Sequence, residues 1–125
     1  MQNKEIIIEK PIAEIYEFAK DPKNYLGKIK GIKENNEIYS YNISGFGLID
    51  AKITNLEENK KVVVYSKNIN TSLEINLLEL EDSKTKVTLV SKSYPSCGLF
   101  KNIIISRAIP KVLNIIADYL KDALL

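Results

Sequence analysis

The chain has 125 residues, of which 45% are apolar and 27% are charged, and its formal net charge is +2. This length predicts one domain with a core large enough to fold without disulfides or metals, and the small net charge with scattered lysines argues against nucleic-acid binding. Because the chain has no histidine and only one cysteine, an internal disulfide, a Cys/His zinc site and a histidine-based catalytic dyad are excluded.

The first elements follow from a short β-branched run and from two prolines. Three consecutive isoleucines predict a strand within residues 4–10. Pro11 occupies a position that favours the start of a helix, and the apolar residues after it recur at helical spacing. Asp21-Pro22 ends this helix, and residues 23–29 predict a second short helix.

The middle of the chain predicts an antiparallel meander. From Gly31 to Tyr94 the spacing of apolar residues changes from helical to alternating. The strands that we expect span residues 32–35, 39–44, 49–54, 61–67, 71–81 and 84–94. In the fifth of these, Leu78 and Leu80 fall on the face opposite to Leu77, which predicts a bulge near Leu77-Leu78.

Residues 99–125 predict a long C-terminal helix of roughly 40 Å, at about 1.5 Å per residue. Its apolar face is too broad to bury against one helix, so it needs a sheet. Pro110 lies inside this pattern and predicts a kink or a break near residues 106–109. The fold class that we expect is α+β, with a curved antiparallel sheet of about seven strands wrapped around the C-terminal helix and two short helices after the first strand.

Two passages, together with the order of these elements, resemble the START-like (SRPBCC) superfamily, also called the helix-grip or pollen-allergen-like fold. The passage Ile8-Glu9-Lys10-Pro11-Ile12-Ala13-Glu14-Ile15-Tyr16-Glu17-Phe18-Ala19-Lys20-Asp21-Pro22 is similar to the first strand and helix of that family. The passage Ser96-Cys97-Gly98-Leu99 resembles the branch of the family named after an accessory protein of carbon monoxide dehydrogenase. The family also includes polyketide cyclase/dehydrase-like and coenzyme Q-binding proteins. The resemblance implies one START-like domain over residues 1–125.

In such a fold, a ligand cavity is expected between the concave face of the sheet and the C-terminal helix. Small inward residues, such as Ser66 and Ser91, either leave room for a ligand or let the helix pack closely. Tyr39 and Tyr41 could hydrogen-bond the polar end of a ligand, or they are ordinary half-buried strand residues. The candidate ligand-binding residues are Tyr39, Tyr41, Ile49, Ala51, Ile53, Val64, Ser66, Ile75, Leu89, Ser91, Ser93, Phe100, Ile104, Ala108 and Val112; Ile43, Val62, Leu73, Leu77 and Ile116 are also expected to face inward.

Arg107 and Cys97 are each the only residue of their type in the chain. Arg107 could bind a carboxylate in a bidentate manner, but its place on the polar side of the helix favours a solvated side chain. Cys97 precedes a helix, where a thiolate is favoured, but no base is near it in the sequence. We therefore interpret Cys97 as a turn residue and assign no catalytic residue.

These features favour a protein that binds a hydrophobic or amphipathic small molecule, such as a lipid, quinone, isoprenoid or polyketide-like compound. One alternative is a polyketide cyclase/dehydratase-like enzyme, although the expected inward positions lack an acid/base pair. A second alternative, implied by the resemblance to the carbon monoxide dehydrogenase branch, is an accessory protein that docks a partner such as a dehydrogenase complex, or a second copy, through an apolar patch.

The sequence also suggests where the protein works. Its first five residues lack the apolar core of a signal peptide, and no uncharged apolar run approaches the roughly 20 residues needed to span a bilayer. We expect a cytoplasmic protein without stable membrane insertion. We expect neither a metal nor a cofactor, because no acidic cluster with recognisable spacing is present.

Overall fold

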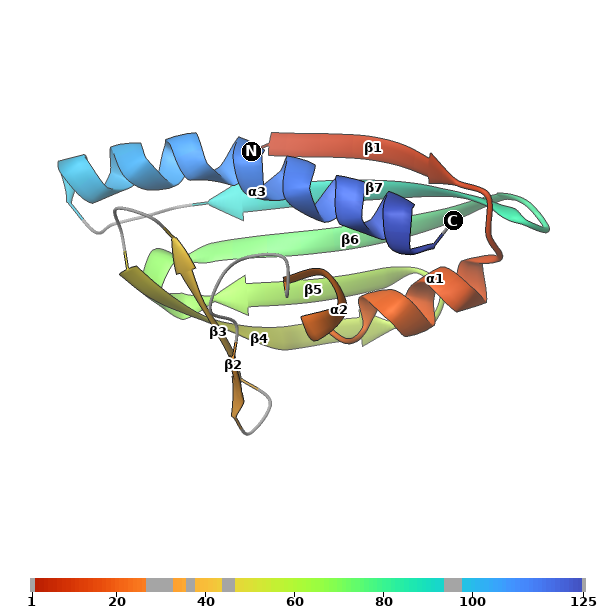
Figure 1. The fold of residues 1–125 in the computed structure, drawn as a ribbon, viewed down its shortest axis with the longest axis horizontal. Coiled ribbons are helices and arrows are strands. Elements are labelled where there is room, and N and C mark those ends of the chain that lie inside the picture. The colour runs from red at the N-terminus through yellow and green to blue at the C-terminus, as the bar shows by residue number, and fades with distance from the viewer. Residues whose placement is uncertain (1, 27–32, 36–37, 44–46, 94–97, 125) are drawn as a thin grey trace.

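In the computed structural model, the described residues are 2–26, 33–35, 38–43, 47–93 and 98–124. Within them, seven strands form one antiparallel sheet in the order β1-β7-β6-β5-β4-β3-β2 (Figure 1). The first strand therefore pairs with the last, and the other strands follow as a meander. The strands are β1 (Gln2–Ile8), β2 (Lys33–Asn35), β3 (Ile38–Ile43), β4 (Gly47–Glu57), β5 (Lys61–Ser66), β6 (Thr71–Glu81) and β7 (Lys84–Ser93).

The helices are α1 (Ile12–Ala19), α2 (Lys23–Leu26), the short 3-10 helix η1 (Lys67–Ile69) and α3 (Leu99–Ala123). Pro11 precedes α1 with a φ of −61°, which confirms its role at the start of the helix. The described part of the second predicted helix is α2; the rest of that prediction lies outside the described residues. The predicted α+β helix-grip architecture is confirmed.

The core lies between one face of the sheet and the helices. Figure 1 shows α3 running along β1 and β7, while α1 and α2 lie nearer β5 and β6. Strand alternation aims every second side chain at this inner face. On adjacent strands Leu73 pairs with both Val64 and Ser91, and Ile75 pairs with both Val62 and Leu89. These cross-strand rows form the surface on which the helices pack.

The bulge predicted near Leu77-Leu78 is wrong. Leu77 pairs with Val87 and Leu78 with Lys86, so the register is continuous there, and it shifts only between Glu79 and Glu81. Leu78 is 58% exposed on the outer face. The strand keeps its phase and leaves a leucine in solvent, because the pairing of the neighbouring residues outweighs the exposure of one side chain. A second register shift lies in β4, between Ile53 and Asn55.

The helix α3 is continuous through Pro110, so the predicted break does not occur, although the helix axis bends near its middle in Figure 1. No helix in the described part of the chain is apolar enough over sufficient length to cross a membrane. The inward face of α3 differs from the prediction by about one residue in phase. The buried residues of α3 are Ile105, Ile109, Leu113, Ile116, Ala117 and Leu120.

Candidate functional site

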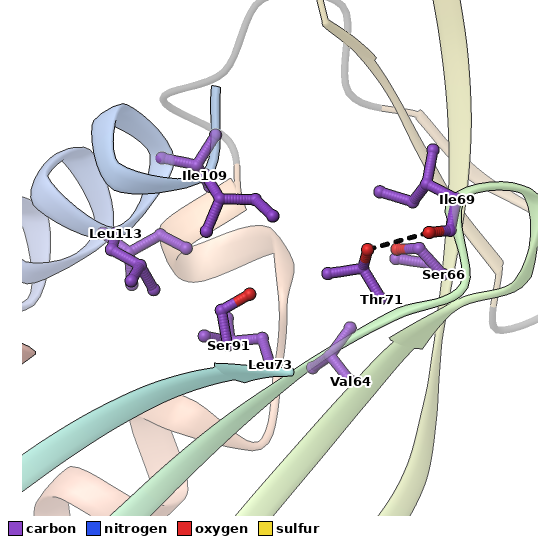
Figure 2. Close-up of a pocket in the computed structure, with 11 residues that line it drawn as sticks. Val64, Ser66, Ile69, Thr71, Leu73, Ser91, Ile109 and Leu113 are labelled. Atoms are coloured by element: carbon purple, nitrogen blue, oxygen red, sulfur yellow. Dashed lines mark hydrogen bonds between the residues drawn. The ribbon is translucent and has the colours of Figure 1, made fainter. Parts of the chain in front are cut away.

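A cavity of about 50 Å³ lies between the sheet and α3 (Figure 2). The inner faces of β4 to β7 form its floor, α3 forms its roof, and η1 closes one side. Its lining residues are Ala51, Val64, Ser66, Ile69, Thr71, Leu73, Ser91, Ile109, Val112, Leu113 and Ile116. Most of them are aliphatic, so this is an apolar space with room for a few water molecules.

Three hydroxyl residues, Ser66, Thr71 and Ser91, are the polar members of this lining. The hydroxyl of Thr71 donates to the Ile69 carbonyl at 2.9 Å, so in the 2.9 Å contact between Thr71 and Ser93 the serine is the donor. This pair fixes the rotamer of Thr71 at the junction of η1 and β6. One rim of the cavity is therefore held in place by hydrogen bonds.

The hydroxyl of Ser91 differs from the other two. Its side chain is buried, with 4% exposure, and Figure 2 shows its oxygen directed into the cavity. Among the described residues, no side-chain hydrogen bond involves this oxygen. A buried hydroxyl without a protein partner is costly unless water or a ligand satisfies it. Ser91 is therefore the group most available to hydrogen-bond a molecule in the cavity.

Within the described lining, no side chain is an acid, a base or a cation. The groups with shifted pKa values lie elsewhere. Burial raises the pKa of the Tyr25 hydroxyl in the core, and a hydrogen bond from Lys92 lowers the pKa of Glu74 on the outer face of the sheet. The cavity can thus hold an apolar molecule and one neutral polar group, but it offers no general acid or base.

The predicted site residues fall into several places. Those that line the cavity are Ala51, Val64, Ser66, Ser91 and Val112, together with the inward-facing Leu73 and Ile116. Ile49, Ile75 and Leu89 are fully buried in the core beside it. Ser93 is half-buried and contacts the rim through Thr71.

The remaining predicted residues are not brought to this cavity. Tyr39 and Ile53 line a separate surface pocket of about 230 Å³ with Lys52 and Leu56. The prediction that Phe100 faces inward is wrong: its side chain is 76% exposed, because the phase of α3 turns it to solvent. Ile104 and Ala108 are half-buried on α3. The side chains of Tyr41 and Ile43, and all of Cys97, lie outside the described residues.

Four lining residues were not predicted: Ile69, Thr71, Ile109 and Leu113. Thr71 shares the alternation of Leu73 and Ile75, so the strand pattern could have identified it. Ile109 and Leu113 require the rotation of α3 about its axis, which a helix rich in isoleucine does not reveal. Ile69 belongs to η1, a single turn for which the sequence carries no periodic signal.

The arrangement of elements is shared with solved structures of very different sequence. One is the Zhui aromatase/cyclase from Streptomyces sp. R1128, with a TM-score of 0.75, 8% identity, and coverage of 98% of this chain and 92% of that one. Another is a START superfamily protein from Mycobacterium smegmatis, with a TM-score of 0.68, 13% identity, and coverage of 98% and 95%. A third is the Aha1 dimer from Colwellia psychrerythraea, with a TM-score of 0.61, 22% identity, and coverage of 98% and 93%. No protein-family model and no curated protein matches the chain.

Proposed function

This chain has the START-like helix-grip fold, and we propose that it binds a hydrophobic or amphipathic small molecule between the sheet and α3. The observation that carries the proposal is the apolar cavity with one unsatisfied hydroxyl, that of Ser91, directed into it. Concave apolar sites with a few polar groups are typical of small-molecule binding. The hydroxyl would orient the ligand, and the aliphatic lining would supply the affinity.

The volume of the cavity restricts how such a ligand enters. About 50 Å³ is far less than the roughly 300 Å³ or more that drug-sized ligands occupy. A lipid, quinone, isoprenoid or polyketide-like molecule therefore requires α3 to move away from the sheet. Pro110 lies between the lining residues Ile109 and Val112, and it lacks the N–H that would bond the carbonyl of Ser106. The helix is thus weakest where it covers the cavity.

Binding is favoured over catalysis by the chemistry of the lining. One solved structure with this fold is an aromatase/cyclase, and a cyclisation or dehydration requires proton transfer to and from the substrate. The described residues around the cavity supply only serine and threonine hydroxyls for this purpose. Neutral hydroxyls orient a ligand well but are weak acids and bases.

Uptake of Nile red, an uncharged apolar dye, tests this proposal. The Ser91→Leu variant fills part of the cavity with a larger apolar side chain and removes its free hydroxyl, so we expect a folded protein whose dye affinity falls by about ten-fold or more. The matched control is Ser72→Leu, because Ser72 lies on the outer face of β6, paired with Lys92. This control should bind the dye as the unmodified chain does.

Two results would overturn the proposal. One is that the unmodified chain does not bind the dye, and the other is that Ser91→Leu binds it unchanged. If the cavity is instead closed by tight packing, the added carbons overpack the core and cost typically about 1–3 kcal/mol of stability. Thermal unfolding of the same variant therefore separates a filled cavity from a strained core.

A further inference from the structure

The first turns of α3 expose large apolar side chains. Leu99 is 81% exposed, Phe100 76% and Ile103 44%. In Figure 1 these turns extend past the end of the sheet, so the sheet does not cover them. Three such side chains at one helix end form a protruding apolar tip that water solvates poorly. We call these three residues the α3 tip.

The segment that begins with the α3 tip is cationic. Residues 99–117 contain three basic residues and no acidic residue, and the first acidic residue of the helix is Asp118. At about 1.5 Å per residue, Asp118 lies roughly 27 Å along the axis from Phe100. The side chains of Arg107 and Lys111 are exposed. The apolar tip is thus followed by positive charge without a nearby acidic group on the same helix.

The tip and the cations share one side of the helix. Phe100, Ile103, Arg107 and Lys111 are separated by three or four residues, which places them in one row along an α-helix. This row lies opposite the buried stripe that contains Ile105 and the residues that follow it at helical spacing. An apolar end continued by exposed cations is the pattern of a segment that lies in a membrane interface.

We propose that the α3 tip docks on the surface of an anionic lipid membrane. Leu99, Phe100 and Ile103 enter the boundary between headgroups and acyl chains, and Arg107 and Lys111 contact the lipid phosphates behind them. This contact is peripheral and does not require α3 to span the bilayer. It also does not depend on ligand binding in the cavity.

Charge and size favour a lipid surface over a second copy of the chain. A two-fold symmetric contact presents the same patch on both subunits, so it would bring the two sets of Arg107 and Lys111 together. The tip has three apolar side chains, whereas a standard protein interface uses about 20–30 residues a side. An anionic membrane needs only a few apolar side chains and adjacent cations.

Vesicle flotation tests the proposal with two lipid compositions. We expect the full chain to bind vesicles of phosphatidylcholine mixed with phosphatidylglycerol, to bind vesicles of phosphatidylcholine alone several-fold less, and to dissociate as salt screens the charges. Phe100→Ser should remove most of the bound protein. Arg107→Glu should lower the affinity for the mixed vesicles by about ten-fold, with little effect on the weak binding to phosphatidylcholine.

The matched control for Phe100→Ser is Leu78→Ser. Leu78 is also more than half exposed, at 58%, but it lies on the outer face of β6 away from the tip. This control should bind the mixed vesicles as the unmodified chain does. Ser91→Leu should also bind them unchanged, which keeps membrane docking distinguishable from ligand binding.

Three results would overturn the proposal. The first is equal binding to both vesicle compositions, which would remove the role of the cations. The second is an equal loss with Leu78→Ser, which would indicate nonspecific apolar contact. The third is a dimer in sedimentation equilibrium that Phe100→Ser dissociates, which would assign the tip to a second copy of the chain.

Discussion

Tyr25 is the largest side chain that is fully buried, and its hydroxyl donates a 2.8 Å hydrogen bond to the carbonyl of Ala19. This bond satisfies a carbonyl at the end of α1, where a helix leaves its last acceptors without partners. Burial raises the pKa of this hydroxyl, which keeps it protonated and able to donate. A residue outside the cavity therefore holds α1 and α2 together against the sheet.

Replacing Tyr25 with phenylalanine should destabilise the protein by about 1–3 kcal/mol, because the buried carbonyl of Ala19 loses its donor. Urea unfolding measures this change. The control is Tyr65→Phe, since the hydroxyl of Tyr65 hydrogen-bonds Asn70 at an exposed site. A loss of stability in Tyr65→Phe as large as in Tyr25→Phe would contradict this account of the buried bond.

Glu74 makes the outer face of the sheet sensitive to acid. It lies on β6 between Lys92 of β7 at 2.7 Å and Lys61 of β5 at 3.5 Å. The hydrogen bond from Lys92 lowers the pKa of Glu74. A carboxyl with a lowered pKa in the folded state contributes stability that is complete above the pKa of an unfolded glutamate, and this stability is lost as the pH falls through the folded pKa.

Glu74→Gln should therefore reduce stability at neutral pH and flatten the decline of stability below about pH 4.5, where an ordinary glutamate titrates. Melting temperature measured against pH checks this. The control Glu79→Gln, at an exposed position of the same strand, should leave the acid limb of the profile in place. An unchanged acid limb in Glu74→Gln would show that the ion pairs are too solvated to matter.

At the scale of elements, strands could be predicted from the sequence better than the helix face. The prediction for residues 71–81 agrees with β6, because alternation of period two has only two phases and the turns on either side fix one of them. In α3, isoleucines on several sides make the apolar face too broad to define a direction, so the pattern predicts Phe100 inward when it faces solvent. Packing on β1 and β7 determines that direction, and the sequence does not encode those contacts locally.

The same distinction explains the candidate site. Ala51, Val64, Ser66 and Ser91 come from strands and line the cavity, whereas Val112 is the only residue of α3 in the predicted set that does so. The inward serines could be recognised because they interrupt apolar positions of a strand. That Ser91 keeps a free hydroxyl could not be predicted, since it depends on where α3 rests.

Pro110→Ala should strengthen α3 by restoring a backbone donor to Ser106. We expect the free energy of unfolding to rise by up to about 3 kcal/mol, and the uptake of Nile red to become slower because the helix moves away from the sheet less readily. Urea unfolding and stopped-flow fluorescence measure the two effects. A more stable variant with unchanged uptake would show that the bend at Pro110 has no part in ligand entry.

A chain that ends at Gly98 should be insoluble or molten, because removal of α3 uncovers the inner face of the sheet. Buried residues of α3, such as Ile105 and Leu120, would no longer cover the strands. Near-ultraviolet circular dichroism and thermal unfolding test this expectation. A cooperative melt close to that of the full chain would rule out a core formed by α3 on the sheet.

For the whole molecule, the cavity follows from how a curved sheet meets a straight cover. The helix α3 packs on β1 and β7, but the inner face continues across β6, β5 and β4. Figure 2 shows α3 residues on one side of the space and β5 and β6 residues on the other. The aliphatic side chains of α3 do not fill the space over the small residues Ala51, Ser66 and Ser91. The central claim is that an apolar molecule occupies that space.

Methyl NMR during a titration with 1-octanol tests this claim most directly. If the alcohol binds in the cavity, the methyl signals of Val64, Leu73, Ile109 and Leu113 shift together and saturate, while Leu78 on the outer face stays unchanged. If the cavity methyls stay unchanged, or if Leu78 shifts equally and without saturation, the alcohol contacts only the surface, and the account of a ligand held between the sheet and α3 is contradicted.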